Sequence, residues 1–300
     1  MEESNNEPSS TALVLSGGGS KGAFQLGALE VLAERGVAYD CVAGVSVGAL
    51  NGTLVACDRL DRLGTIWRTI ERRDVYRGRW PWVLFKVLTG RKGLYNNAPL
   101  LKLIRREVDP DDIDIPLEIG VVKLESGEYV AIRPDSPRFN ELVFASTSIP
   151  IIWPPYETGG DSFVDGGLRN ITPLGDVIDH HPDRVIIITT EPRDKPPASM
   201  RPGNIIDVAQ RSLSILLDET FDNDIDAFLR INRLVKQAEQ GGVTLQRPDG
   251  GTYQFFDHLL IEPDDPLGSG LDFDRRSLDA WIAQGRAAAE RALDATDLPV

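Results

Sequence analysis

A serine flanked by glycines is the first feature of the chain whose residue types could carry out chemistry. The segment Gly44-Val-Ser46-Val-Gly48 lies between an apolar run, Cys41–Val45, and a segment expected to be helical, Val47–Cys57. This context is typical of a nucleophile elbow, a sharp strand-to-helix turn that exposes the serine hydroxyl at the edge of a sheet. The glycines leave room for the turn, and the N-terminus of the helix favours negative charge. A plain turn of small residues has the same composition, so the motif alone is only moderately specific.

A second glycine-rich turn, Gly17-Gly18-Gly19-Ser20-Lys21-Gly22, follows the apolar run Thr11–Leu15. Its G-x-G-x-x-G spacing matches a dinucleotide-binding loop, which requires an acidic residue at the end of the next strand to hold the ribose. Asp40 precedes that strand, and Ser46 stands where the acid would be. Consecutive glycines can instead direct main-chain N–H groups into one space and bind the oxyanion of an acyl intermediate. The neighbouring serine favours this oxyanion hole, made by Gly17, Gly18 and Gly19.

A serine nucleophile also needs a proton acceptor, and Asp165 is one candidate. It directly follows a short strand expected over Ser162–Val164, and Gly166 and Gly167 come next. A carboxylate at this point can project into the site while the main chain turns away. Asp-Gly-Gly is also a common turn sequence, so this motif is weak when taken alone.

The three histidines are weaker candidates for the base. His180 and His181 precede the strand expected over Arg184–Thr190, which puts them at the end of a parallel sheet opposite the serine. His258 lies inside a segment expected to form a strand, Tyr253–Ile261. The chain order serine, aspartate, histidine matches an α/β-hydrolase, so a Ser-Asp-His triad that includes His258 stays open as an alternative.

These residues are carried by a repeated order of strand, small-residue turn and helix, which predicts a parallel sheet with crossover helices. Residues 1–10 are expected to be disordered, and residues 191–203, with four prolines, are a linker candidate. We expect residues 11–300 to form a single α/β domain with a C-terminal helical layer from about residue 203. Further strands are expected at 117–124 and 128–132, and further helices at 21–35, 58–70, 205–240 and 276–293.

The composition limits the partners and cofactors of the chain. A net charge of −14 over 300 residues argues against binding to nucleic acid and against docking on anionic lipid, but it is compatible with a transient apolar contact with a membrane or micelle. The small number of metal-binding residue types, two cysteines and three histidines, argues against a transition-metal site, and no cofactor is expected. The sequence shows neither a secretory signal nor an apolar run long enough to span a bilayer, which predicts a cytoplasmic protein. It does not reveal the oligomeric state.

Four motifs, in this order, resemble those of the patatin-like phospholipase (lipid acyl hydrolase) family. The resemblance covers roughly residues 11–290, with weaker likenesses at Gly93–Leu100 and Phe273–Gly285. The motifs are the glycine loop Gly17–Gly22, the elbow Gly44–Gly48, the segment Ala145–Pro150 followed by Trp153–Pro155, and Asp165–Gly167 followed by Asn170 and Pro173-Leu174.

The resemblance implies a three-layer α/β/α fold around a mainly parallel sheet and a Ser–Asp dyad without histidine. Ser46 would be the nucleophile, Asp165 the base and the Gly17–Gly19 amides the oxyanion hole, in a metal-free enzyme that cleaves acyl esters of lipids. Gly44 and Gly48 would shape the elbow. Supporting positions would be Lys21, Gly22, Gly166 and Gly167.

Two other functional classes and one apolar segment remain open. A nucleotide-binding oxidoreductase would explain the glycine loop but neither Ser46 nor Asp165. A catalytically silent scaffold would keep the fold without the chemistry. The segment Trp80-Pro-Trp-Val-Leu-Phe85 could form a lipid-facing lip or part of the core.

Overall fold

A mixed sheet runs through the centre of the computed structural model, which describes residues 10–78, 92–195, 201, 203–248 and 250–296. The strand order is β5-β6-β3-β2-β1-β7-β8, and β4 pairs with β3 outside this path. The strands are β1 (Thr11–Leu15), β2 (Cys41–Val45), β3 (Leu117–Lys123), β4 (Tyr129–Ile132), β5 (Tyr156–Thr158), β6 (Asp161–Asp165), β7 (Arg184–Ile188) and β8 (Asp257–Ile261). The α-helices are α1 (Gly22–Glu34), α2 (Val47–Ala56), α3 (Leu60–Thr69), α4 (Arg72–Val75), α6 (Ala98–Glu107), α7 (Phe139–Ser146), α8 (Leu174–Ile178), α9 (Ile205–Gln240) and α10 (Arg275–Asp294).

The sheet is mainly parallel, as the sequence predicts. Strands β3, β2, β1, β7 and β8 run parallel to one another, whereas β4, β6 and β5 add an antiparallel edge beside β3. Parallel strands require crossover helices, and these cover both faces of the sheet. The α/β fold class is therefore confirmed.

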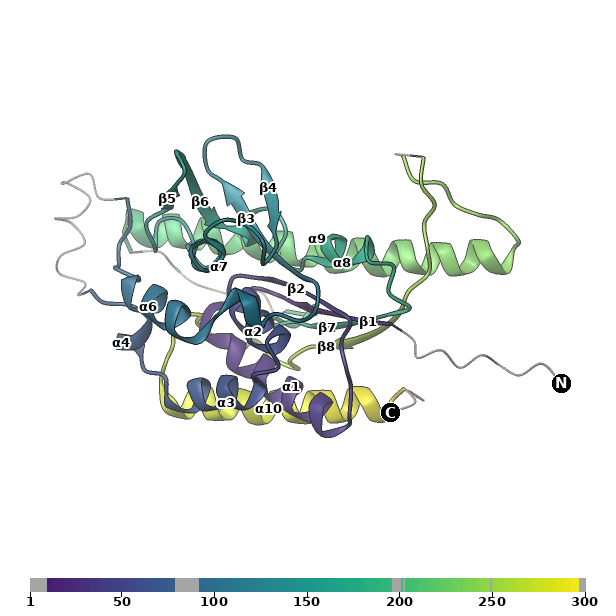
Figure 1. Ribbon diagram of the computed structural model, residues 1–300, viewed down its shortest axis with the longest axis horizontal. Helices are drawn as coiled ribbons and strands as arrows, with labels where there is room; N and C mark the ends of the chain where they lie inside the picture. Colours follow the sequence, from purple (N-terminus) through teal and green to yellow (C-terminus); the bar gives the residue numbers. More distant parts are fainter. Residues whose placement is uncertain (1–9, 79–91, 196–200, 202, 249, 297–300) are drawn as a thin grey trace.

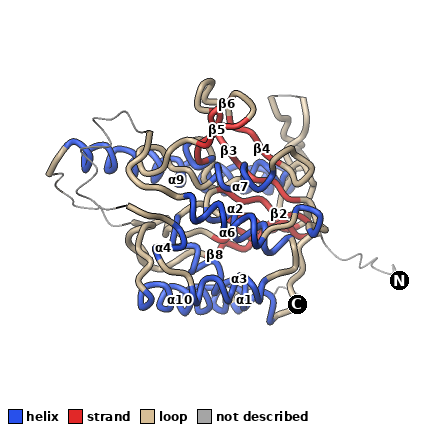
Figure 2. The backbone as a smooth tube through the Cα atoms, turned by 60° about the vertical axis from the view of Figure 1, so that its left-hand side comes forward, coloured by secondary structure: helices blue, strands red, loops and turns tan. Residues whose placement is uncertain are grey.

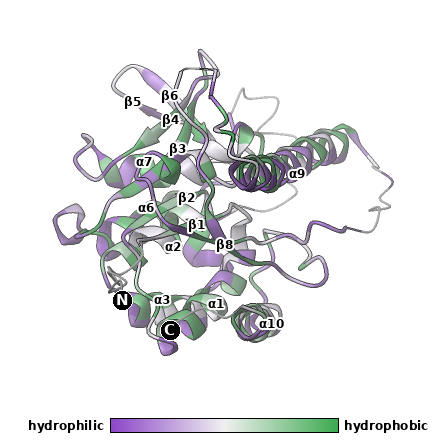
Figure 3. Ribbon diagram, turned by 90° about the vertical axis from the view of Figure 1, so that its right-hand side faces the viewer, coloured by the Kyte–Doolittle hydropathy of each residue, from purple (hydrophilic) through white to green (hydrophobic). Residues whose placement is uncertain are grey.

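Alternation along β1 divides the core into two layers. Leu13 and Leu15 belong to a core with residues of α1, α2, α3 and α10, whereas Ala12 and Val14 belong to one with residues of α8 and α9. Successive side chains of a strand point to opposite faces, so an apolar run such as β1 has to be covered on both sides. Figure 1 shows α9 along one side of the sheet and α1, α3 and α10 along the other, and the turned views of Figures 2 and 3 show the same layers.

The C-terminal part differs in two ways from the expectation. It does not form one helical layer, because α9 and α10 lie on opposite faces of the sheet, with β8 between them in the sequence. The strand expected at 253–261 is shorter, since the N–H and C=O of Phe256 bond to the side-chain amide of Asn232 instead of to a neighbouring strand. The sequence predicts no range for helices α4, α6, α7 and α8 or for strand β5.

We propose that the chain from residue 11 onward forms one domain, because β8, α9 and α10 complete the sheet and the layers that begin with β1. The predicted disordered tail lies, except for its last residue, outside the described residues. So do the apolar segment Trp80–Phe85 and part of the linker candidate.

Candidate active site

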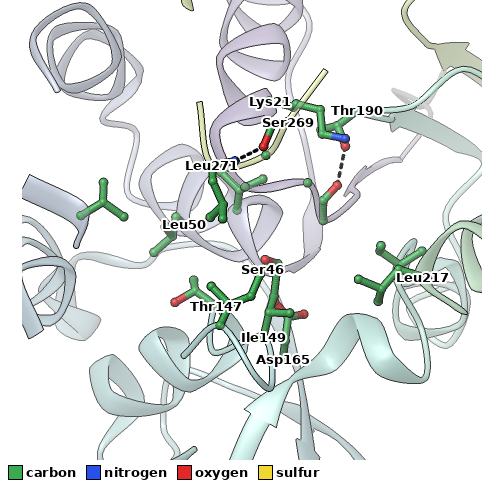
Figure 4. A pocket seen from close by; sticks show the side chains of 18 of the residues that line it. Lys21, Ser46, Leu50, Thr147, Ile149, Asp165, Thr190, Leu217, Ser269 and Leu271 are labelled. Atoms are coloured by element: carbon green, nitrogen blue, oxygen red, sulfur yellow. Dashed lines mark hydrogen bonds between the residues drawn. The ribbon is translucent and has the colours of Figure 1, made fainter. Parts of the chain in front are cut away.

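Sheet topology brings three distant segments of the chain to one edge. Leu15 of β1 is paired with Gly44 of β2, so the glycine loop after β1 and the serine turn after β2 lie side by side. Asp165, at the end of β6, is paired with Val121 of β3, one residue beyond the partner of Val45. The serine, the aspartate and the three glycines line one cavity of about 630 Å³. Figure 4 shows Ser46 and Asp165 next to each other on its wall.

Ser46 sits on a strained turn. Its φ of 56° and ψ of −122° lie in a region that L-residues rarely adopt, and α2 begins at the next residue. Glycine is required on both sides because the strand and the helix approach closely. A Cβ atom on Gly44 would lie 2.3 Å from the carbonyl oxygen of Gly48, and one on Gly48 would lie 2.1 Å from that of Leu15. The geometry matches the elbow that the motif predicts.

Ser146 holds this strained turn in place. Its Oγ accepts a hydrogen bond from the Ser46 N–H at 2.9 Å and donates one to the Gly120 carbonyl at 2.7 Å. Ser146 is fully buried at the end of α7. The hydroxyl therefore ties the elbow to β3, a role that the sequence could not reveal because its partner is 100 residues away.

Asp165 is a buried carboxylate with one oxygen free. Its Oδ1 accepts a hydrogen bond from the Gly167 N–H at 2.8 Å, and its Oδ2 has no partner within the described chain. Burial raises the pKa of Asp165 to about 7, and the Gly167 N–H and the Ser46 hydroxyl oppose this rise. A free carboxylate oxygen with a pKa near neutrality suits a general base. A side chain on Gly166 would meet the Gly120 carbonyl at 2.4 Å, so the main chain turns tightly here.

The glycine loop lies against the serine, but its three amides are not equivalent. A Cβ atom on Gly17 would lie 3.3 Å from that of Ser46. The Gly17 N–H, however, donates to the Ile171 carbonyl at 3.0 Å, so in this conformation it is not free to bind an oxyanion as expected. Within the described residues, the N–H groups of Gly18 and Gly19 have no acceptor. Gly19 has a φ of 64°, and a side chain there would meet the Gly270 carbonyl at 2.3 Å.

Two further side chains fix the glycine loop. Thr190, after β7, donates its hydroxyl to the Gly17 carbonyl at 2.5 Å. Asp224 of α9 accepts the N–H groups of Ile171 and Thr172 at 2.8 and 3.1 Å, and so holds the carbonyl to which Gly17 is bonded. Neither residue was singled out in the sequence, since both act across long sequence separations.

Lys21 does more than begin a helix. Its ammonium group is buried at the cavity, where it pairs with the carboxylate of Glu191. Burial, together with the nearby Lys195, lowers the pKa of Lys21 to about 8, and Asp218 opposes the shift. Gly22 packs tightly too, since a side chain there would lie 2.3 Å from a methyl group of Val47.

His258, the base of the alternative triad, and Asp40, the acid that a nucleotide site would need, both lie away from Ser46. His258 is on β8, and the register through β7 and β1 places it level with Cys41, five residues before Ser46. His258 is therefore separated from Ser46 by about 16 Å along the strands and by about 14 Å across three strand spacings. Asp40 lies at the opposite end of the sheet, where its carboxylate accepts the Thr11 N–H at 2.6 Å. It cannot hold a ribose at the glycine loop.

Across the described segments, no helix has the length and apolar character that spanning a membrane requires.

Both cysteines, Cys41 and Cys57, are buried, and burial raises the pKa of each thiol to about 11. They are inert as nucleophiles at neutral pH.

Comparison with known proteins identifies relatives of the chain. The family model described as patatin-like phospholipase matches residues 13–178, more than half of the chain. An uncharacterised NTE family protein of Mycobacterium tuberculosis is 26% identical over 214 residues, which make up 69% of this chain and 57% of that protein. A lysophospholipase NTE1 of Cryptococcus neoformans is 26% identical over 200 residues, 61% of this chain and 12% of that protein. The chain thus spans little more than half of the mycobacterial relative.

Among solved structures, VipD from Legionella pneumophila superposes with a TM-score of 0.49 at 13% identity, covering 96% of this chain and 67% of that one. The type III effector protein ExoU superposes with a TM-score of 0.43 at 14% identity, covering 98% of this chain and 54% of that one.

Proposed function

The chain belongs to the patatin-like phospholipase family, and from this premise we propose that it is a serine lipid acyl hydrolase of the phospholipase A or lysophospholipase type. The observation that carries the proposal is the shared cavity of Ser46 and Asp165, in which one carboxylate oxygen and two glycine N–H groups have no partner within the described residues. These are the groups that acyl transfer through a serine needs.

In the proposed reaction, Asp165 accepts the proton of Ser46 as Oγ attacks the carbonyl carbon of an acyl ester. The carbonyl oxygen becomes an oxyanion and accepts hydrogen bonds from the Gly18 and Gly19 N–H groups. The ester C–O bond then breaks, and the departing alcohol takes the proton from Asp165. Water, deprotonated by the same carboxylate, then attacks the acyl carbon; the bond to Ser46 Oγ breaks, Oγ takes the proton back from Asp165, and the fatty acid is released.

The raised pKa of Asp165 supports this role. A carboxylate at the ordinary pKa of Asp would be a poor acceptor for a serine proton, and a pKa of about 7 makes the free carboxylate more basic without keeping it protonated at slightly alkaline pH. No histidine is needed, and the position of His258 in the sheet argues against the triad alternative.

The shape of the cavity supports an acyl substrate. Its lining is dominated by apolar side chains, which α2, α3 and α6 supply on the side of Leu50, whereas Leu217 of α9 faces them across the space (Figure 4). An alkyl chain buried there leaves water, a favourable transfer of about 25 cal/mol per Å² of apolar surface. We propose a transient contact with a membrane or micelle, from which such a substrate has to be taken.

The test is hydrolysis of a short-chain p-nitrophenyl ester by wild type, Ser46→Ala and Asp165→Asn. We expect both variants to lose turnover while their circular dichroism spectra stay native. His258→Ala is the matched control and should keep wild-type turnover. Near-parental activity of either dyad variant would refute the assignment, and an inactive wild type would favour a silent scaffold.

A further inference from the structure

The cavity wall changes its chemistry from one side to the other. The side formed by α2, α3 and α6 is apolar except for Asn51, whose amide is bonded to Gly22, Gln25 and Trp67, and Glu107, whose carboxylate is bonded to Arg62 and Arg106 at 2.7 Å. The side formed by the end of β7 and the N-terminal half of α9 carries the other charged groups besides Asp165. These are Lys21, Glu191, Lys195, Arg211 and Asp218. An ester bound at Ser46 therefore has an apolar region on one side and a charged region on the other.

Four of these five charged residues neutralise one another in pairs. Lys21 is paired with Glu191, and Lys195 is paired with Asp218 at 3.1 Å. The ammonium group of Lys195 also lies 4.7 Å from the ring centre of Phe221. These contacts hold the two lysines in place and leave Arg211 as the remaining charge on this wall.

The guanidinium of Arg211 makes no ion pair or hydrogen bond within the described residues, although it is half-buried at the cavity. Arg211 differs in this from the other four charged residues of the same wall, each of which has an oppositely charged partner. A guanidinium presents five N–H donors in a plane, a geometry that matches two oxygens of a phosphate. Its unused donors in a lipid-sized cavity indicate a ligand that brings phosphate oxygens.

We propose that Arg211 binds the phosphate of the substrate's head group, with the acyl chain directed toward α2, α3 and α6 and the head group toward α9. This inference rests on the proposed acyl hydrolase function and assigns to one residue the distinction between phosphate-bearing and neutral lipid esters. Arg211 is then a specificity-determining residue, because it contacts the leaving group and no reacting atom. It lies outside residues 13–178, which match the family model.

The experiment compares two esters with the same decanoyl chain, decanoyl-lysophosphatidylcholine and monodecanoylglycerol. We expect Arg211→Gln to lower kcat/KM for the phosphate ester by about 10- to 100-fold, as the loss of hydrogen bonds to a charged group does, and to leave kcat/KM for the neutral ester unchanged. Arg230→Gln, an exposed arginine on the same helix, is the matched control and should change neither value. Equal losses on both esters, or no loss on the phosphate ester, would overturn the proposal.

Binding to Ser46→Ala protein tests the same site without turnover. Calorimetry should show tighter binding of the lysophospholipid than of the neutral ester, and Arg211→Gln should remove this preference. If wild type hydrolyses neither ester but the binding preference holds, the hydrolase function fails and the head-group site stands. Inorganic phosphate is the third ligand, and binding as tight as that of the lysophospholipid would show a free-anion site and overturn the proposal.

Discussion

The substitution Asp165→Asn should abolish turnover and should also raise the free energy of unfolding. Asp165 is 3% exposed, and burial raises its pKa from 3.8 to about 7. Between these two values the native state holds a proton that the unfolded chain has released, so the stability from this group is present at low pH and is lost as the pH rises through 7. Asparagine has nearly the same shape and no proton to lose. Its oxygen can accept the Gly167 N–H, and its amide can donate to Ser46.

The size of the effect follows from the pKa shift. From about pH 5.5, where the unfolded carboxyl is already ionised, to about pH 8.5, the wild type should lose about 2 kcal/mol of unfolding free energy through this group, since one pKa unit is worth about 1.4 kcal/mol. Urea unfolding of both proteins at the two pH values measures the difference, in which the other titrating groups cancel. The advantage of Asp165→Asn should grow by about 2 kcal/mol from the lower to the higher pH. An advantage that is the same at both pH values would refute the buried, proton-binding carboxylate.

The remaining predictions concern turnover. The kcat/KM of wild type on a neutral ester should rise with a midpoint near pH 7, because Asp165 acts as a base only when it is ionised; a flat profile from pH 6 to 8 would contradict this role. Gly19→Ala should lower kcat by about 100- to 1000-fold, which is the usual effect of losing one oxyanion donor, because a side chain there would push the loop away from Gly270. Stopped-flow acylation rates measure this effect, and an unchanged rate would show that Gly19 is not part of the site. Ser146→Ala should lower the unfolding free energy by about 1–3 kcal/mol, because it removes the hydroxyl that bonds to the buried Ser46 N–H and Gly120 carbonyl. It should also lower kcat with little change in KM, and an effect on KM alone would contradict the positioning role.

Most of the strands and the longer helices could be predicted closely because their signals are local. Strands β1 and β2 begin and end at the predicted residues, since apolar runs buried on both faces stand out between polar or small-residue turns. Helix α9 also has its predicted bounds. Helix α6 was missed although Pro99 near its start and the spacing of Leu100 and Ile104 are helical signals. Strand β5 has three residues, too few for any alternation to be seen.

Parts of the site could not be predicted because they depend on contacts between distant segments. The motifs indicated Ser46 and Asp165, and the structure places both at one cavity. That the Gly17 N–H is already bonded depends on Ile171, which α9 holds through Asp224. No local pattern reveals such bonds, because the partners are brought together only by the fold.

The most direct test of the central claim is reaction of the protein with a fluorophosphonate, followed by mass spectrometry of the intact chain and of its peptides. A serine activated by a neighbouring carboxylate attacks phosphorus and keeps the phosphonyl group. We predict one adduct, located on Ser46, in the wild type, and no adduct in Ser46→Ala or Asp165→Asn. An unmodified wild type, or an adduct on a different residue, would contradict the proposed Ser–Asp dyad.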